Sequence, residues 1–356
     1  MRKRWEKLTE HINKKGLDAM LVTSMINARY FSGFTGDNVT LLITGEKRIL
    51  FTDFRYTIQA KIQSENFFDV REVQKSREIE ALADEIKALG LKRVGFEEQT
   101  VSVGRFEEWK CFPCEFVPAS EMLAEIRLIK SADEIENIVK AQNISDDAFL
   151  DILGRMKPGM TEKEVAVELE YRIKNGGADD IAFDIIVASG ENGALCHAVP
   201  GLRKLAYGDL VVMDFGSKLN GYCSDMTRTV AIGEPSKKLC EIYRIVYEAQ
   251  SIALDALKPG ISCKALDAAA RDYIASFGYG ECFGHSLGHG FGLEVHEGPA
   301  ASSRSEEVLK PGMTVTVEPG IYIEGLGGVR IEDCCIVTED GHINPVTASK
   351  ELLIIE

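Results

Sequence analysis

Gly208-Asp-Leu-Val-Val-Met-Asp214 has a counterpart further along the chain in Gly312-Met-Thr-Val-Thr-Val-Glu318. In each stretch a glycine precedes an apolar run and an acid closes it. Short apolar runs of this kind are typical of strands buried on both faces. An ionised carboxylate at the end of such a strand is costly unless a cation or hydrogen bonds compensate it. Both acids therefore need partners.

The repetition continues on either side of these two strands. Lys157-Pro-Gly-Met-Thr161 recurs as Lys258-Pro-Gly-Ile-Ser262, and in both copies the hydroxyl residue is placed to cap an amphipathic helix. Downstream, each strand leads through a turn to another acid, Asp225 in the first copy and Glu332 in the second. The sequence thus predicts two similar halves related by a pseudo-two-fold axis, with carboxylates converging on that axis.

The dipeptide Asn220-Gly221 predicts the pairing in the first half. A two-residue hairpin loop at this dipeptide places Asp214 opposite Thr227. It also places Asp225 opposite Gly216, on the same face of the hairpin as Asp214. The two acids then become diagonal neighbours, about 7–8 Å apart at their backbones.

The second half follows the same logic, because the Gly-rich turn Gly325-Leu-Gly-Gly328 separates Glu318 from Glu332. Four acids gathered at close range would repel one another, and two divalent cations would neutralise them. Oxygen-rich ligation favours manganese or related ions, with cobalt or zinc as alternatives.

Histidines gather in the same part of the chain. Four of the six lie in glycine-rich or turn-like segments: His197, His285, His289 and His296. Glycines closely flank His289, so the backbone can approach a ligand there, and we expect His289 to bind metal. A helical zinc pair of His285 and His289 is the rival interpretation, but Gly288, Gly290 and Gly292 oppose a helix. For His285 we expect hydrogen bonding beside the site, and the glycine spacing fits a dinucleotide loop poorly.

Two domains are expected from the length of 356 residues. Residues 1–125 alternate strand-like and helix-like segments, which indicates a small α/β domain. Ser131, with Glu134 three residues later, forms a capping box that opens a long helix, so a second domain is expected over residues 126–356.

Together these motifs resemble the creatinase-like, or pita-bread, metallopeptidases, which include Xaa-Pro aminopeptidase, prolidase and methionine aminopeptidase. The resemblance covers nearly the whole chain. It implies an α/β (α+β) fold in which residues 126–356 form a catalytic pita-bread domain with a curved, mainly antiparallel sheet. It also implies a homodimer in which domain 1–125, including the stretch Phe51-Thr-Asp-Phe-Arg-Tyr56, roofs the partner's catalytic cleft. A strand end followed by a helix start is the plainer interpretation of that stretch.

The resemblance carries the family's metal ligands onto Asp214, Asp225, His289, Glu318 and Glu332. It implies that Asp225 and Glu332 bridge two ions. His197 and His296 would contact the substrate and the developing tetrahedral intermediate. Glu318 would accept the proton of the attacking water. Arg330 would either orient Glu332 or contact the substrate.

We therefore expect a peptidase that cleaves short peptides between an N-terminal residue and proline. Aminopeptidase action is favoured because Ala300 and Ala301 follow Pro299, where related dipeptidases often carry arginine; Xaa-Pro dipeptidase action is the alternative. A non-enzymatic binding protein on this fold is a remote alternative, because such members usually lose metal ligands. Methionine aminopeptidases generally lack a domain like 1–125, and amidinohydrolases of the family do not keep the metal set.

Composition excludes several other classes of protein. A net charge of −15 opposes binding to nucleic acid. No apolar run is long enough to span a membrane, and residues 1–7 lead into an amphipathic pattern rather than a signal core. Nine scattered cysteines indicate reduced thiols and a cytoplasmic location. The pair Cys111-Phe-Pro-Cys114 is interpreted as two thiols flanking a turn rather than a redox motif.

Overall fold

A computed structural model describes all of residues 1–356, and the chain separates into two units, Met1–Arg127 and Leu128–Glu356. The first unit is built on a mixed six-stranded sheet in the order β4-β3-β2-β1-β5-β6. Its strands are β1 (Ala19–Val22), β2 (Thr40–Thr44), β3 (Arg48–Thr52), β4 (Asp69–Glu72), β5 (Arg93–Phe96) and β6 (Glu115–Pro118). Its helices are α1 (Arg2–Lys14), α2 (Met25–Ser32), α3 (Thr57–Gln63), α4 (Glu78–Ala88), α5 (Val103–Glu108) and α6 (Ser120–Leu128).

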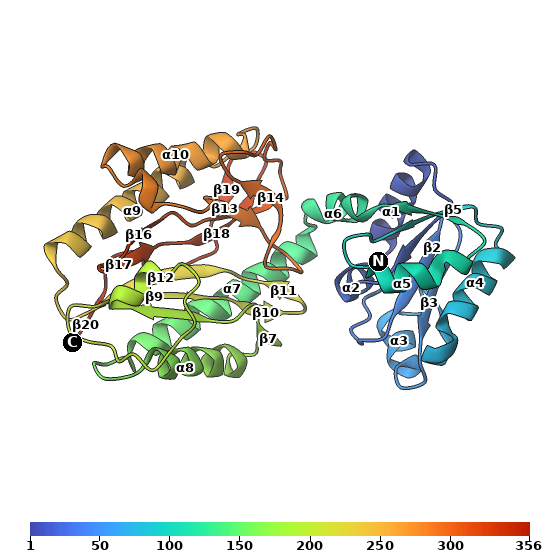
Figure 1. Cartoon of the computed structure of the whole chain (residues 1–356), viewed down its shortest axis with the longest axis horizontal. Helices are drawn as coiled ribbons and strands as arrows, with labels where there is room; N and C mark the ends of the chain where they lie inside the picture. Colours follow the sequence, from blue (N-terminus) through green and yellow to red (C-terminus); the bar gives the residue numbers. More distant parts are fainter. The chain divides into compact units, whose positions relative to one another are not determined.

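The second unit has two halves of similar construction, each with two helices packed on strands. The first half contains α7 (Ala132–Leu153), α8 (Glu162–Asn175), β8 (Ile186–Ser189), β9 (Leu210–Phe215) and β12 (Met226–Ile232). The second half contains α9 (Lys237–Ala256), α10 (Cys263–Ser276), β15 (Thr314–Val317), β16 (Gly320–Ile323), β17 (Gly327–Arg330) and β18 (Asp333–Val337). Figure 1 shows α9 and α10 along one side of these strands and α8 along the other.

Further strands complete the second unit: β7 (Asp180–Ile181), β10 (Ser217–Leu219), β11 (Tyr222–Cys223), β13 (Gly288–Gly290), β14 (Glu297–Ala301), β19 (His342–Ile343) and β20 (Ile354–Ile355). The pairs within this unit are antiparallel, except that β12 and β20 run parallel. The predicted fold, a small α/β domain followed by a pita-bread domain with an internal repeat, is therefore confirmed. None of the helices combines the length and the apolar character needed to cross a membrane.

Helix starts follow the predicted caps. Ser131 donates from its N–H and its hydroxyl to Glu134 at the start of α7. Thr161 and Ser262 each accept a backbone N–H at the start of α8 and α10, so the repeated hydroxyl residues act alike in both halves. Each half also has its own apolar core, because α7 and α8 pack on β8, β9 and β12, whereas α9 and α10 pack on β15, β17 and β18.

The hairpin register agrees with the prediction. Asp214 lies opposite Thr227 in the β9–β12 ladder. The same register continues through β10 and β11 to the turn, where Asn220 and Gly221 both have positive φ angles, 50° and 83°. Two left-handed residues in a two-residue loop are the geometry that twists a hairpin correctly.

The second half places its acids differently. Val317 lies opposite Asp333, and Gly320 lies opposite Arg330, so Glu318 and Glu332 occupy facing positions of one register. An isolated β-bridge between Thr227 and Glu332 joins strands of the two halves. The acids therefore meet where the halves meet.

Candidate metal centre

A pocket of about 660 Å³ opens in the second unit and collects the residues singled out from the sequence. Its lining includes Asp214, Asp225, Glu318, Glu332, His197, His285, His289, His296 and Arg330. Part of the remaining wall is apolar, with Phe183, Ile185, Ile186, Val199, Pro200 and Val295. The volume lies in the range of small-molecule sites.

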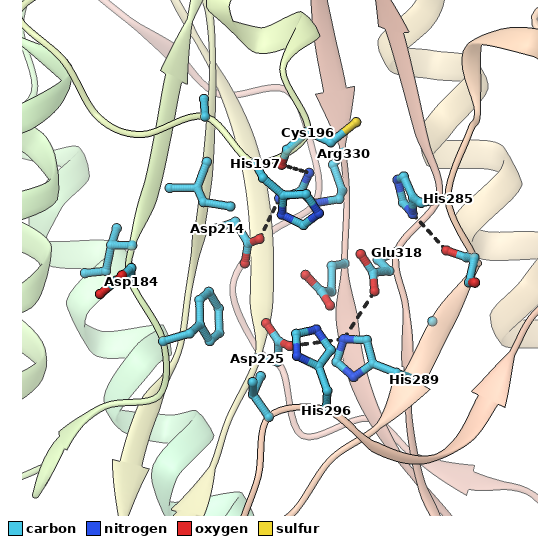
Figure 2. A pocket seen from close by; sticks show the side chains of 18 of the residues that line it. Asp184, Cys196, His197, Asp214, Asp225, His285, His289, His296, Glu318 and Arg330 are labelled. Atoms are coloured by element: carbon cyan, nitrogen blue, oxygen red, sulfur yellow. Dashed lines mark hydrogen bonds and ion pairs between the residues drawn. The ribbon is translucent and has the colours of Figure 1, made fainter. Parts of the chain in front are cut away.

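Strand ends position the four acids. Asp214 is the penultimate residue of β9, and Asp225 directly precedes β12. Glu318 directly follows β15, and Glu332 lies in the short gap between β17 and β18. Because these strands are fixed by their apolar cores, the carboxylates are held in place by the fold rather than by one another. Figure 2 shows Asp214, Asp225 and Glu318 converging with His289.

Three of these side chains form a tight ligand set. Ligand atoms of Asp225, His289 and Glu332 all lie within 4.8 Å of one another. Nε2 of His289 also lies 3.6 Å from Asp225 Oδ2 and 3.4 Å from Glu318 Oε1. These contacts are not salt bridges, since burial lowers the pKa of His289 to about 4 and the ring is neutral near pH 7.

The tautomer of His289 tests whether a metal fits. Its Nδ1 lies 3.1 Å from the carbonyl oxygen of Gly290. A carbonyl only accepts, so Nδ1 carries the proton and Nε2 presents a lone pair to two carboxylates. A lone pair facing carboxylate oxygens is unfavourable unless a cation or a proton lies between them, and a backbone bond on the other ring nitrogen is the usual support of a ligating histidine.

The four acids also indicate that the site fits metal ions. Burial raises the pKa of Glu318 to about 8. Burial, together with the negative charge of Glu332, raises the pKa of Asp225, and burial together with the negative charge of Glu318 raises the pKa of Glu332. In addition, Oδ1 of Asp214 is buried without a hydrogen-bond partner. Crowded carboxylates and an unpartnered oxygen are what a set of divalent cations would satisfy, so the donor set fits such ions.

Arg330 is the one permanent cation among the lining residues, and it is fully buried among the acids. Its Nη2 donates to Asp214 Oδ2 at 2.5 Å, and its Nε donates to Thr227 Oγ1 at 3.0 Å. The hydroxyl of Thr227 in turn donates to Glu332 Oε2 at 2.6 Å. Of the two roles considered for Arg330, these contacts favour orientation of carboxylates over contact with substrate.

A second chain of hydrogen bonds leads from Arg330 to His285. Nη1 of Arg330 donates to the hydroxyl of Tyr322, which lies 2.9 Å from Nε2 of His285. Nδ1 of His285 lies 2.8 Å from the carbonyl of Ser286, so the tyrosine donates to Nε2. Burial lowers the pKa of His285 to about 4, which keeps this acceptor neutral. The contacts place His285 beside the acids as a hydrogen-bonding residue.

The remaining two histidines are exposed at the pocket. The His296 ring lies 4.3 Å from the His289 ring, centroid to centroid. His197 lies near Arg330 on the opposite side of the carboxylates (Figure 2). The two rings thus flank the cluster, where they can reach a bound substrate.

Sequence reasoning missed Tyr322 and the bridging role of Thr227. The register prediction had placed Thr227 opposite Asp214, which was a usable signal for its position but not for its partner Glu332. No motif marked Tyr322, although it follows Glu318 by four residues on β16. Outside the pocket, Cys111 is exposed, and burial raises the pKa of Cys114 to about 11, so Cys114 is not an activated thiolate.

Two family models match the chain. The Creatinase/Prolidase N-terminal domain matches residues 4–129, and Metallopeptidase family M24 matches residues 136–339. The chain belongs to metallopeptidase family M24. The resemblance drawn from the motifs is therefore confirmed. This M24 chain is a hydrolase acting on peptide bonds, and its family implies divalent metal ions.

Relatives cover the whole of this M24 chain. An Xaa-Pro dipeptidase of Pyrococcus furiosus is 40% identical, over 99% of this chain and 100% of the relative. The structure of an Xaa-Pro dipeptidase from Bacillus anthracis is 44% identical, with a TM-score of 0.96 and 99% of each chain covered. The structure of an X-Pro aminopeptidase from Thermotoga maritima is 42% identical, with a TM-score of 0.92 and 99% of each chain covered.

Proposed function

We propose that this chain is an Xaa-Pro dipeptidase that cleaves the bond between an N-terminal residue and proline. The observation that carries the proposal is a single pocket in which a carboxylate–histidine cluster, two exposed histidines and an apolar wall face one another. Relatives that match the full length, such as those of Pyrococcus furiosus and Bacillus anthracis, are named Xaa-Pro dipeptidases. These names favour the dipeptidase alternative over the aminopeptidase expected from the sequence.

In this proposal Asp214, Asp225, His289, Glu318 and Glu332 hold two divalent ions, of which manganese suits the oxygen-rich set best. When bound, such ions lower the pKa of water and polarise the scissile carbonyl. Glu318 takes up the proton of the attacking water, since its carboxylate lies among the residues that would hold the ions. His197 and His296 donate hydrogen bonds to the developing oxyanion or to the leaving proline nitrogen.

The apolar wall supplies the proline specificity. A proline ring brings no N–H to the scissile bond and presents only methylene groups to the protein. Phe183, Ile185 and Val295 line the pocket and offer the matching apolar surface. Burying the ring there is favourable at about 25 cal/mol per Å² of apolar surface.

An Xaa-Pro aminopeptidase that accepts longer peptides is the second candidate. Ala300 lines the pocket, so this part of the wall carries no cation for a free carboxylate. Arg330 cannot readily serve, because its guanidinium already bonds to Asp214, Thr227, Tyr322 and the carbonyl of Cys196. In a dipeptidase the carboxylate would then be received by histidines, by the metal ions, by Arg304 or by a partner subunit.

A hydrolysis panel separates the candidates. Purified protein is incubated with manganese and with Xaa-Pro or Xaa-Pro-Yaa peptides, and kcat/KM is compared. Selectivity for the dipeptides supports the dipeptidase, and equal or better cleavage of tripeptides supports the aminopeptidase. Activity should vanish with a chelator and return best with manganese or cobalt. Full activity in protein that elemental analysis shows to be free of divalent metal would refute the metal assignment.

We also propose that the chain acts as a homodimer in the cytoplasm, with domain 1–125 roofing the partner's pocket and domain 126–356 carrying the catalytic site. Large apolar side chains are exposed on the first unit at Phe54, Ile58 and Ile62, four residues apart, as expected of a face that another chain covers. All nine cysteines are free thiols, which suits a reducing compartment. Light scattering that shows a fully active monomer would refute the roofing role.

A further inference from the structure

The loop that carries His197 is poorly held by packing. It follows β8, and over residues 190–203 its larger apolar side chains, Leu195, Val199 and Leu202, are exposed, with Val199 87% accessible, whereas Leu205, closer to β9, is buried. Among the loop's apolar residues, Ala198 packs into a small cluster with Ile186, Ala188 and Val212. The position of the exposed His197 must therefore come mainly from polar contacts.

Those contacts converge on one carboxylate. Glu162, the first residue of α8, is only 1% exposed and lies outside the pocket lining. Its Oε1 accepts from the N–H and the hydroxyl of Ser189, both at 2.8 Å, and from Nδ2 of Asn192 at 3.0 Å. Its Oε2 accepts from Nδ2 of Asn192 at 3.1 Å and from the N–H of Gly201 at 3.2 Å.

The residues bound by Glu162 lie on both sides of His197. Ser189 and Asn192 precede it, and Gly201 follows it, so one buried group closes the loop at its base. The backbone adds to the closure, since the N–H of Glu162 donates to Arg203 and the N–H of Lys163 donates to Gly201. A carboxylate, which only accepts, matches this set of donors, and the first turn of a helix favours its negative charge.

We propose that Glu162 is a positioning residue for His197, acting through the loop of residues 189–203. The inference rests on the proposed function, in which His197 contacts the substrate. Three further contacts fix the same loop: Arg330 donates to the carbonyl of Cys196, Arg203 donates to the hydroxyl of Ser189 at 2.7 Å, and Gly193 approaches Gly328 too closely to admit a side chain. Arg203 joins the two ends directly, and Glu162 holds the start and the end of the loop through five hydrogen bonds.

The second half of the unit contains a similar arrangement. Asp267 on α10 is 1% exposed; it accepts the N–H of Leu287 and pairs with Arg271. Arg271 in turn donates to the carbonyls of Phe283 and His285. In both halves, an acid on the repeated helix therefore holds the segment that carries a histidine of the pocket. This parallel supports a positioning role for Glu162 in the first half.

A double-mutant cycle tests the proposal. Glu162→Gln keeps the shape of the side chain but replaces one accepting oxygen by an NH₂ group. This NH₂ group would then face the N–H and O–H donors of the loop. The variant should lower kcat/KM for an Xaa-Pro dipeptide by about ten- to hundredfold, mostly in kcat. In a His197→Ala background the same change should cost about twofold or less. Equal losses in the two backgrounds would overturn the proposal.

Glu164→Gln is the matched control. The Glu164 carboxylate accepts from Thr161 at the same helix end but does not touch the loop, so its loss weakens the cap alone. We expect this variant to stay within about twofold of the parent chain. If Glu164→Gln loses as much activity as Glu162→Gln, the loss comes from the weakened helix cap rather than from the loop, and the proposal is overturned. If Glu162→Gln folds poorly, Asn192→Ala removes two of the five bonds and should show the same dependence on His197.

Trypsin separates this inference from the proposed function. Cleavage after Arg203 and Lys204 should be faster in Glu162→Gln than in Glu164→Gln, whatever substrate the enzyme uses. A parent chain that cleaves no Xaa-Pro peptide would refute the proposed function, and the trypsin comparison would still report on the loop. Equal rates of trypsin cleavage in the two variants would show that Glu162 does not close the loop.

Discussion

Replacing Thr227 by valine should loosen metal binding without unfolding the protein. The Thr227 hydroxyl is completely buried between two charged groups, donating to Glu332 and accepting from Arg330. Hydrogen bonds to charged groups contribute about 1.5–3 kcal/mol each, so the two together contribute roughly 3–6 kcal/mol. Valine has nearly the same shape, so the change removes the bonds without opening a cavity.

Only part of that energy concerns the metal site. If the roughly 1.5–3 kcal/mol of the Glu332 bond is lost to metal binding, the affinity falls about ten- to hundredfold, since 1.4 kcal/mol corresponds to a factor of ten. The measurement is the chelator concentration that removes half of the metal from the purified protein. Thermal unfolding of the metal-loaded form is followed in parallel.

Thr229→Val provides the matched control. Thr229 is two residues further along β12 and equally buried, but its hydroxyl donates to the backbone carbonyl of Arg330 and accepts the N–H of the same residue. Those neutral bonds contribute about 0.5–1.5 kcal/mol each, and neither orients a carboxylate. This variant should lower the melting temperature and leave the chelator midpoint unchanged. Equal chelator midpoints for the two variants would refute the reasoning.

Three other outcomes are expected. Asp225→Asn should remove more metal than His296→Ala, measured by elemental analysis after dialysis; the reverse order would exchange their assigned roles. Ala300→Arg should raise the preference for Xaa-Pro over Xaa-Pro-Yaa peptides by about tenfold through a charge-assisted bond to the free carboxylate, and an unchanged ratio would place carboxylate recognition elsewhere. Deletion of residues 1–125 should leave metal content intact but reduce dimerisation and substrate selectivity, and a dimeric, fully selective fragment would contradict this.

Local chemistry explains why much of the fold could be predicted. A two-residue turn such as Asn220-Gly221 has few alternatives, and it fixed the register that placed Thr227 opposite Asp214. Caps at Thr161 and Ser262 were equally local, because a hydroxyl bonds to an N–H three residues away. The acids stood out because a charge at the end of an apolar run requires an explanation.

The supporting contacts were not predictable because they join distant segments. Thr227 and Glu332 are 105 residues apart, and Arg330 and Cys196 are 134 apart. No turn or periodicity brings such pairs together; they follow from the way the two halves pack. Tyr322 and Glu162 were overlooked for the same reason, since a tyrosine in a strand and an acid in a first helical turn each have ordinary explanations.

The repeat also explains why one site serves two halves. Each half supplies two strand-end acids, and a pseudo-two-fold axis necessarily brings the like charges of both halves to the same place. Without cations this region would be electrostatically unfavourable, because one buried arginine faces four carboxylates. The bridge between Thr227 and Glu332 lies in that region and joins the halves. Ions that neutralise the acids would therefore also stabilise the contact between the halves, so the proposed catalytic site and the junction of the two halves would depend on the same interactions.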